Sequence, residues 1–428
     1  MKKILKAVCR VCNHTSLDSI FDLGQIPLSG TFLEAGEFLP SMPLNLARCS
    51  NCGLVQLHDD LPIEDLYSSN YGYESHLNTS MVQHLKSKAE RLAKLFIDGT
   101  ANPISQEAPL FILDIASNDG TLLSQFENIF GARVNLLGCD PLISNFDDRY
   151  PINAIKIEKF FTSENIGNNF LGKLDLVTSL SVFYDVRKPI EFAQDIWNLL
   201  TPGGYWHLEQ SYFPSMLKNN SYDTICHEHL LYYSANDLRN IAQKVGFNIV
   251  EAELNDVNGG SLEITLQKSG NKSKQGYEDS KFIELCNFEE NSGISDGTAE
   301  KEFADRAREH GVKLHRTISD LKEKGNEIFC LGASTKGNII LNHASLDNNL
   351  ISSVGEVNKK KFGKVTPGTN IPICDENLIL NSSGENRVAV VLPWHFRTTF
   401  IEKAQFFLET GGKLIFPLPE IEIIQNSK

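Results

Sequence analysis

The sequence contains no apolar run of the roughly 18 residues that a membrane-spanning helix requires. Its basic start, MKKILKAVCRVC, is not followed by an apolar core of signal-peptide length. Positive charge is also scarce: 40 Lys and Arg face 54 Asp and Glu, which leaves a net charge of −14 at pH 7. We therefore expect a cytoplasmic protein without a membrane partner, and the acidic balance argues against nucleic acid as a partner.

Disulfide bonds are a further expected absence, because 9 cysteines in a cytoplasmic chain indicate metal binding or packing. Hydrophobic residues at 41% and charged residues at 22% exclude wholesale disorder. A chain of 428 residues is too long for one core and predicts two or three domains.

Three regions differ in their pattern, and we predict domains at residues 1–70, 71–270 and 271–428. The first contains two CxxC pairs. The second alternates strand-like runs such as FILDIA and LDLVTSL with amphipathic stretches, which is typical of a parallel α/β sheet. In the third, a helix predicted at 298–324 leads into EIFCLGASTKGN, a second strand–glycine–helix unit. The predicted fold class is α/β, with a small zinc-binding N-terminal domain followed by two Rossmann-like domains.

The two CxxC pairs predict a structural zinc site. The pairs are separated by 36 residues, and each can form a tight turn on which both thiolates converge. Four thiolates complete a tetrahedral shell and leave no open position, so the metal would stabilise the fold instead of doing chemistry. The predicted ligands are Cys9, Cys12, Cys49 and Cys52. The alternative is four unrelated cysteines or a redox pair.

A cofactor site is predicted where PLFILDIASNDGTLLSQF passes from a buried strand into a helix. Small loop residues let the backbone approach a ligand, and the helix N-terminus offers free N–H groups. The dinucleotide pattern GxGxxG is absent. The next strand ends in an aspartate that can accept both hydroxyls of a ribose, and a third strand could frame an adenine. The candidate residues are Asp114, Ala116, Asn118, Asp119, Gly120, Asp140, Pro141, Ser179 and Ser181.

These strand ends, followed by the turn LLTPGG, occur in the order of a class I methyltransferase sheet, which implies S-adenosylmethionine as the cofactor. A single such loop would fit other nucleotide-binding folds equally well. Asp119 has a second interpretation, as a residue that caps the helix after the loop.

Several longer motifs carry a family resemblance. They include YGYESHLNTS, LDIASNDGTLL, DTICHEHLLYYS, NGGSLEI, GASTKGN, NKKKFGKVTPGTNIPI and LPWHFR. With the paired CxxC motifs, they resemble the sugar C-methyltransferases of deoxysugar biosynthesis over nearly the whole chain. That family has a zinc-binding N-terminal region, a central S-adenosylmethionine-dependent methyltransferase domain and a C-terminal nucleotide-sugar-binding region.

The resemblance implies a reaction on a nucleotide-linked 4-keto-6-deoxysugar, at C3, in which a base removes a proton beside the ketone and the enolate takes the methyl group. Such chemistry requires a base, a group that steadies the enolate oxygen, and exclusion of water. By resemblance His229 is the base, Glu228 is its partner or a sugar ligand, Tyr73 lies near the reacting sugar, and His227 binds substrate. Packing or solvated polar residues are the alternative.

This chain departs from the family pattern at three positions. Cys226 replaces a common tyrosine, Asp185 replaces a common histidine, and His395 stands where asparagine is usual in the PW-x-x-R motif. We predict that Cys226 and Asp185 lie beside the chemistry, and that His395 and Arg397 lie on the substrate side.

GASTKGN follows a strand and opens a helix, so its amides and lysine suit a phosphate. Together with the lysines at 359–364 it predicts a cradle for the diphosphate of a sugar nucleotide, involving Lys336, Asn338 and Lys361. A structural glycine turn with solvated lysines is the alternative.

The sequence thus predicts a sugar-nucleotide C-methyltransferase, as a monomer or weak homo-oligomer. Two alternatives remain. A zinc-ribbon RNA methyltransferase would share the first two domains but should be basic. A catalytically altered relative would bind nucleotide sugar without methylating it.

Overall fold

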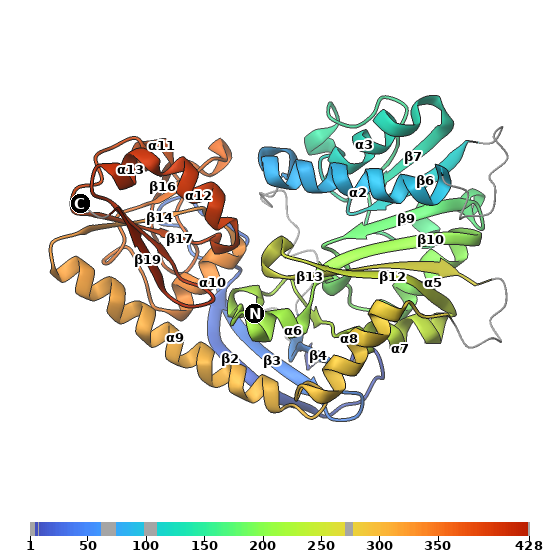
Figure 1. The fold of residues 1–428 in the computed structure, drawn as a ribbon, viewed down its shortest axis with the longest axis horizontal. Coiled ribbons are helices and arrows are strands. Elements are labelled where there is room, and N and C mark those ends of the chain that lie inside the picture. The colour runs from blue at the N-terminus through green and yellow to red at the C-terminus, as the bar shows by residue number, and fades with distance from the viewer. Residues whose placement is uncertain (1–4, 7, 61–73, 98–108, 270–276, 427–428) are drawn as a thin grey trace.

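A computed structural model of the chain describes residues 5–6, 8–60, 74–97, 109–269 and 277–426. Within these residues the strands form a four-stranded, a seven-stranded and a six-stranded sheet, besides one short two-stranded pair. Figure 1 shows the two larger sheets as separate α/β units, with the four-stranded sheet below and between them.

The N-terminal sheet is antiparallel and is completed by a strand from the central part of the chain. Its order is β11-β4-β3-β2. The strands are β2 (Leu17–Pro27), β3 (Ser41–Cys49), β4 (Val55–Leu57) and β11 (Leu231–Tyr232), while β1 (Leu5–Lys6) pairs separately with β5 (Asp59–Asp60). Strand β11 closely follows His227–Glu228–His229 (the HEH segment). Its pairing with β4 therefore anchors the HEH segment against the N-terminal sheet.

The central sheet has the order β12-β13-β10-β9-β6-β7-β8, and β6 to β10 are parallel. Its strands are β6 (Leu110–Ile115), β7 (Val134–Cys139), β8 (Ile155–Ile157), β9 (Leu174–Leu180), β10 (Leu200–Ser211), β12 (Phe247–Asn255) and β13 (Ser261–Lys268). The parallel strands are nearly continuous apolar runs because helices cover the sheet. The antiparallel hairpin β12–β13 forms one edge.

Helices of the central unit begin and end at recognisable signals. α7 (Ala235–Val245) starts with a capping box between Ser234 and Asp237 and ends at Gly246 with φ 102°. α5 (Pro189–Leu199) begins with proline at its first position. The other helices are α2 (Thr79–Ile97), α3 (Thr121–Phe130), α4 (Ser163–Ile166), α6 (Phe213–Lys218) and α8 (Ser280–Asn291).

The C-terminal unit is a second doubly wound sheet in the order β16-β15-β14-β17-β18-β19, with only β19 antiparallel. Its strands are β14 (Glu327–Leu331), β15 (Val354–Glu356), β16 (Ile373–Asp375), β17 (Arg387–Val391), β18 (Lys413–Phe416) and β19 (Glu422–Gln425). Its helices are α10 (Thr335–His343), α11 (Asn377–Leu380), α12 (Arg397–Lys403) and α13 (Gln405–Glu409). The first strand, β14, is central, which puts a topological switch point between β14 and β17.

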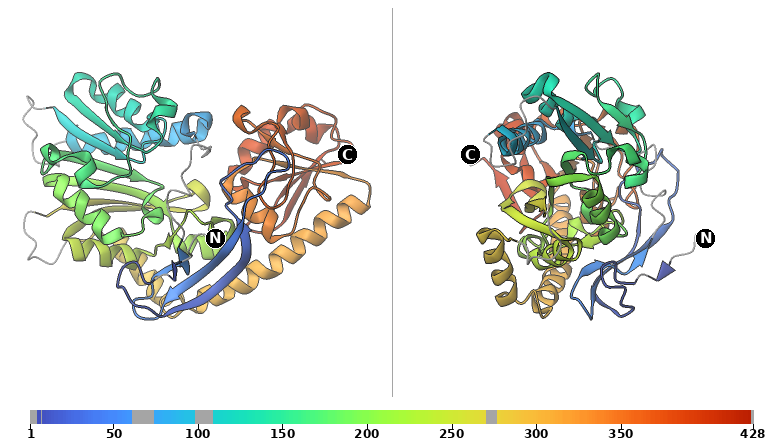
Figure 2. Two further views of the ribbon diagram at one scale, coloured as in Figure 1. Left: turned by 180° about the vertical axis from the view of Figure 1, so that it is seen from behind. Right: turned by 90° about the vertical axis from the view of Figure 1, so that its right-hand side faces the viewer.

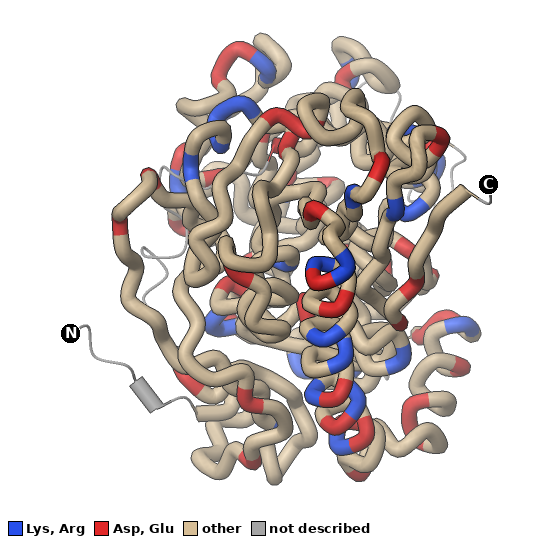
Figure 3. Tube along the Cα trace, turned by 90° about the vertical axis from the view of Figure 1, so that its left-hand side faces the viewer, with Lys and Arg blue, Asp and Glu red and all other residues tan. Residues whose placement is uncertain are grey.

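Two long elements join the parts. α9 (Thr298–Glu323) packs against β2, α6 and β14, and so contacts all three parts of the chain. The β2–β3 hairpin runs beside the C-terminal unit, as the two views of Figure 2 show. On the side shown in Figure 3, acidic and basic residues are mixed, including along α9.

The structure confirms the predicted fold class and the second strand–glycine–helix unit. The predicted helix at 298–324 is α9. The proposed domain bounds stay a prediction; β11 lies in the N-terminal sheet, and α8 packs on α7 and β12 of the central unit. Among the described residues no helix combines the length and apolarity needed to cross a membrane.

Candidate active site

The four predicted metal ligands lie together. The Sγ atoms of Cys9, Cys12, Cys49 and Cys52 are all within 4.8 Å of one another. Zn–S bonds of about 2.3 Å in a tetrahedron separate the sulfurs by about 3.7 Å, and the Cys9–Cys52 and Cys12–Cys49 pairs are 3.5 and 3.6 Å apart. Gly53, at φ 80°, closes the second turn by donating its amide to the carbonyl of Cys49. The predicted cluster is confirmed, and it fits a structural zinc ion.

The loop after β6 has the backbone conformation of a ligand-binding turn. Ala116, Asn118 and Gly120 all have positive φ, at 56°, 48° and 75°. Asp114 is the last but one residue of the strand, and its carboxylate accepts a hydrogen bond from the hydroxyl of Thr178 at 2.6 Å. Burial raises the pKa of Asp114 to about 7, although the Thr178 hydrogen bond opposes this.

Asp140 follows the neighbouring strand β7 and faces the same loop. Its two carboxylate oxygens accept the amides of Asn118 at 3.0 Å and Leu142 at 2.8 Å. A carboxylate has about four acceptor positions, so both oxygens can still accept ribose hydroxyls. Burial raises the pKa of Asp140, and the two amides oppose that rise.

Asp119 caps the helix after the loop, as one of its two interpretations states, and its role toward the cofactor stays a prediction. Its Oδ1 accepts from the hydroxyl and amide of Thr121 in the first turn of α3, as in the capping interpretation. Its Oδ2 accepts from the amide and ring of His76, each at 2.9 Å. Despite burial, these hydrogen bonds hold the pKa of Asp119 below its usual value. Asp119 therefore fixes the 3-10 helix η1 (Ser75–Leu77) against the cofactor loop.

One cleft of about 690 Å³ contains residues from all three parts of the chain. Gly30 and Phe32 come from the N-terminal part, and the cofactor loop and His229 come from the central unit. The C-terminal unit contributes the loop 332–336 and the strand ends near 356 and 393. The candidate residues that line it are Asp114, Ala116, Asn118, Asp119, Asp140, Pro141, Ser181, Asp185, Glu228, His229, Lys336, Lys361 and His395.

Ser179 was predicted to frame the cofactor, but the structure contradicts this. It is fully buried in β9, and its hydroxyl accepts the indole N–H of Trp206 at 2.8 Å. Ser181, two residues on, has φ 53° and lines the cleft. Leu180, which ends the strand, and Ser181, which begins the loop, line the cleft, whereas the side chain of Ser179 packs inward against Trp206.

His229, the predicted base, lines the cleft, and one of its ring nitrogens is hydrogen-bonded. Its Nδ1 lies 2.8 Å from the carbonyl oxygen of Thr224, which assigns the proton to Nδ1 and leaves the lone pair on Nε2. The ring of Tyr184 packs against it at 4.3 Å. Burial, with a smaller effect of the Lys336 charge, lowers the pKa of His229 to about 3. The imidazole is therefore neutral at pH 7, although so low a pKa also makes it a weak base in the free protein.

Glu228 places a buried carboxyl group in the same cleft as His229. Its Oε2 has no hydrogen-bond partner among the described residues, which is expected of a group that binds a polar ligand. A Cβ at Gly30 would lie 2.5 Å from Oε1, so only glycine lets the N-terminal loop approach this carboxyl. Burial raises the pKa of Glu228.

Neither His227 nor Cys226 lines the cleft, but Cys226 lies beside Glu228, which does, so its predicted place next to the chemistry stays a prediction. His227 is 1% exposed and lies against the backbone of Met42 and Pro43, and burial lowers its pKa to about 4. Cys226 is fully buried, and burial raises the pKa of its thiol. Residues 226–229 form a turn, closed by the amide of His229 donating to the carbonyl of Cys226 at 3.1 Å, and this turn places Glu228 and His229 in the cleft while His227 packs on β3.

Asp185 lies in the 3-10 helix η5 (Phe183–Asp185) and lines the cleft beside Tyr184, as predicted. Tyr73, predicted near the reacting sugar, lies outside the described residues.

The predicted substrate residues of the C-terminal unit divide into two groups. Lys336 and Lys361 line the cleft, and their ammonium groups donate to the carbonyls of Asn258 and Ala333, each at 2.8 Å. Asn338 does not line it: it is fully buried and donates to the carbonyl of Ser29 at 2.7 Å. Two positions along α10 therefore separate a lysine that lines the cleft from an asparagine that packs on the N-terminal loop.

Arg397 was predicted on the substrate side, but it is half exposed and pairs with Glu422 at 2.7 Å. His395 does line the cleft, and its Nδ1 has no hydrogen-bond partner among the described residues. Burial, with the charge of Lys336, lowers the pKa of His395 to about 3.

The sequence did not reveal an ionic contact at the mouth of the cleft. Glu74, just before η1, pairs with Arg149 at 2.9 Å and with Lys360 at 2.8 Å. Because Lys360 belongs to the C-terminal unit, this contact ties that unit to the segment that clamps the cofactor loop. In the sequence, only the run of lysines at 359–361 indicated that this region makes charged contacts.

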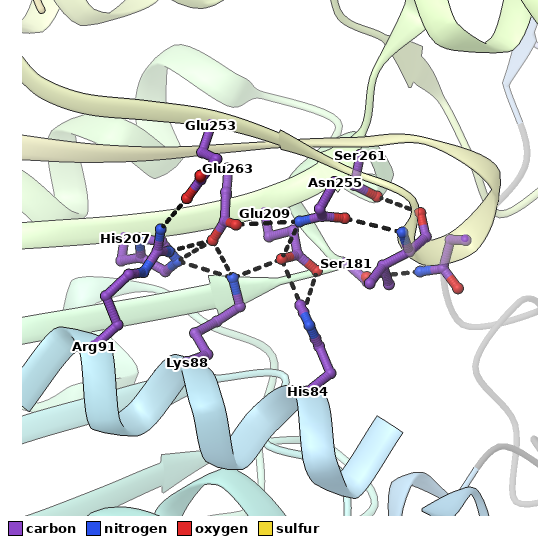
Figure 4. Close-up of polar contacts among 12 residues, drawn as sticks. His84, Lys88, Arg91, Ser181, His207, Glu209, Glu253, Asn255, Ser261 and Glu263 are labelled. Atoms are coloured by element: carbon purple, nitrogen blue, oxygen red, sulfur yellow. Dashed lines mark hydrogen bonds and ion pairs between the residues drawn. The ribbon is translucent and has the colours of Figure 1, made fainter. Parts of the chain in front are cut away.

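A buried charge network behind the cleft was also missed. Figure 4 shows His84, Lys88 and Arg91 of α2 pointing at Glu209 of β10 and Glu263 of β13. Lys88 lies 2.6 Å from Glu209 and also contacts Glu263. Asn255 Nδ2 donates to both carboxylates, and its Oδ1 accepts the amide of Val257. The network thereby holds η7 (Val257–Gly259), the tip of the β12–β13 hairpin, at the cleft.

Family models match three consecutive stretches of the chain. A zinc binding domain matches residues 9–67, a methyltransferase domain matches 85–252, and a C-methyltransferase C-terminal domain matches 256–419. The C-methyltransferase NovU of Streptomyces niveus is 27% identical over 437 residues, covering 99% of each chain.

Two solved structures resemble part of the chain. CurJ carbon methyltransferase covers 46% of this chain and 57% of its own, with 12% identity and a TM-score of 0.36. DszA carbon methyltransferase covers 45% and 56%, with 12% identity and a TM-score of 0.34.

Proposed function

We propose that this chain, an S-adenosylmethionine-dependent C-methyltransferase with a structural zinc site, methylates a carbon of a nucleotide-linked 4-keto-6-deoxysugar, at C3. The observation that carries the proposal is the shared cleft. It joins the cofactor loop, the neutral imidazole of His229 and the crevice of a second Rossmann-like unit.

The second unit has the strand ends that a nucleotide requires. Ligands of doubly wound sheets bind at the carboxyl ends of strands, beside the topological switch point. Here the loop 332–336 follows β14, and Glu356 ends β15, where an acidic residue can accept ribose hydroxyls. The N-terminus of α10 and the ammonium of Lys361 suit a diphosphate. Ribose, diphosphate and sugar can then extend along the cleft toward His229.

The protein's own groups account for the steps at the sugar. Nε2 of His229 takes the proton from C3, and the C–H electrons form a C=C bond while the carbonyl electrons move to oxygen. Glu228 holds a sugar hydroxyl through its unpartnered oxygen. When bound, S-adenosylmethionine would supply a methyl group on a sulfonium: its transfer to the enolate carbon would form a C–C bond, break the C–S bond and leave that electron pair on sulfur, giving S-adenosylhomocysteine. Enclosure between three domains excludes water that would reprotonate the enolate.

The RNA methyltransferase alternative has less support, because the net charge is −14 and the second α/β unit has no role in it. The test is incubation with methyl-labelled S-adenosylmethionine and a panel of 4-keto-6-deoxysugar nucleotides. Label should enter one or more sugar nucleotides. Saturable binding without transfer would instead assign the chain as a catalytically altered relative, and transfer to RNA alone would refute the proposal.

A further inference from the structure

Lys336 belongs to the C-terminal unit, but its side chain contacts the central unit in the cleft that His229 also lines. It lies in the first turn of α10, which packs against the 3-10 helix η6 (Tyr222–Thr224) just before the HEH segment. Its ammonium donates to the carbonyl of Asn258, at the tip of the β12–β13 hairpin, at 2.8 Å. Lys336, Asn258, His229 and His395 all line the same cleft.

The acceptor that holds this ammonium is itself fixed. Asn258 has φ 56°, and its side chain donates to Ser181 beside the cofactor loop. The next residue, Gly259, fits against Trp394, because a Cβ there would lie 3.1 Å from the indole. The carbonyl of Asn258 therefore aims Lys336 from a rigid position. An ammonium has three N–H donors, and Asn258 takes only one of them.

The electrostatic surroundings support the same placement. The positive charge of Lys336 contributes to the lowered pKa of both His229 and His395, so it lies near both rings. A fully buried carboxylate, Asp223, faces the ammonium; its Oδ2 accepts the indole N–H of Trp394 at 2.9 Å. These contacts join the catalytic segment, the hairpin tip and the C-terminal unit around one cation.

We infer that Lys336 is a catalytic residue that stabilises the enolate oxygen, in place of the diphosphate-binding role predicted from its motif. The inference rests on the proposed function. As His229 removes the C3 proton, the carbonyl oxygen gains the electron pair, and the ammonium of Lys336 donates a hydrogen bond to it. When the enolate carbon takes the methyl group, the C=O bond re-forms and the oxygen leaves this hydrogen bond. Preorganised donors of this kind act most strongly where water is excluded.

Lys361 provides the matched comparison. It comes from the same unit and lines the same cleft, but it packs over the ring of Phe32 and donates to Ala333 at the start of the loop. A diphosphate ligand should affect substrate binding, whereas an enolate-stabilising group should affect the proton-transfer step.

The experiment measures solvent deuterium exchange at C3 of the substrate, and kcat and KM for methyl transfer, in wild type, Lys336→Met, Lys336→Arg and Lys361→Met. Lys336→Met should lower the exchange rate and kcat by about 10²- to 10³-fold with KM within about threefold. Lys336→Arg should recover part of both. Lys361→Met should raise KM and leave exchange at saturating substrate unchanged. Histidine NMR should show that Lys336→Met raises the pKa of His229 and His395.

A raised KM with unchanged kcat in Lys336→Met would overturn the inference and restore the diphosphate role. If Lys336→Met left the pKa values of His229 and His395 unchanged, the inference would be overturned. This measurement requires neither substrate nor turnover. Failure of the proposed function is distinguishable, because then the wild-type protein would neither exchange nor methylate any sugar nucleotide of the panel.

Discussion

Replacing Lys88 by methionine should lower the free energy of unfolding by about 3 kcal/mol. Lys88 is buried between Glu209, at 2.6 Å, and Glu263. Methionine retains the apolar stem but removes the charge. Breaking a buried ion pair costs about 3–5 kcal/mol, and the lower end applies because Glu209 keeps His84 and Glu263 keeps Arg91.

The same network predicts a pH dependence. Although burial opposes ionisation, hydrogen bonding to His84 and the charge of Lys88 hold the pKa of Glu209 at about 2. A folded-state pKa below the unfolded value of about 4.3 stabilises the protein above that pH. The stabilisation is lost as the pH falls from about 4.3 toward 2. Lys88→Met should raise the pKa of Glu209 toward its unfolded value, so that less stabilisation is lost over this range and the loss is complete at a higher pH.

Urea unfolding followed by fluorescence measures the cost, and hydrogen exchange of the α2 amides localises it. Lys188→Met is the control, because Lys188 pairs with Glu191 on the surface with both side chains about 70% exposed. That variant should change stability by less than about 0.5 kcal/mol. If Lys88→Met were as stable as Lys188→Met, the network would not be holding α2 on the sheet.

Four further outcomes are expected. Wild-type protein should contain one zinc per chain by metal analysis, and Cys49→Ser should lose it with a reduced folding yield; a soluble, fully active, metal-free variant would contradict the structural role. Asp140→Ala should weaken S-adenosylmethionine binding by roughly 10- to 100-fold in calorimetry, as expected for lost hydrogen bonds to a charged group, and unchanged affinity would place the ribose elsewhere. Because burial raises the pKa of Asp114 to about 7 and a cationic cofactor favours the ionised form, affinity should increase from about pH 6 to about pH 8 and be flat in Asp114→Asn. His229→Asn should reduce methyl transfer by about 10²–10⁴-fold while both ligands still bind; solvent exchange at the sugar carbon that persists there but disappears in Asp185→Asn would make Asp185 the base.

Local patterns predicted much of the fold. Buried strands such as LFILDI and the turn residues after them are determined by nearby sequence, and so are the CxxC turns. The insertion of β11 into the N-terminal sheet is different, because it depends on packing between segments more than 170 residues apart, Leu231 with Gln56. The residue pattern within either segment does not indicate that the two strands pair.

Site residues could be predicted from the sequence where a motif determines the backbone conformation. They were harder to predict where the direction of a side chain determines whether it reaches the cleft. The cofactor loop and Asp140 follow from strand ends. Ser179 and His227 were misassigned because each is adjacent to a residue that does line the cleft, while its own side chain packs inward, against Trp206 and against β3 respectively. Asn338 and Arg397 were misassigned because helix phase and an ion pair turn them away. The cation Lys336 could not be assigned a role until three units were placed together.

Carbon-13 NMR of the product made from S-adenosylmethionine with a labelled methyl group tests the central claim most directly. The account predicts a labelled methyl carbon coupled to a ring carbon of the sugar, adjacent to the ketone, with the nucleotide unmodified. A methyl group attached to oxygen or nitrogen, or carried by the nucleotide base, would contradict it.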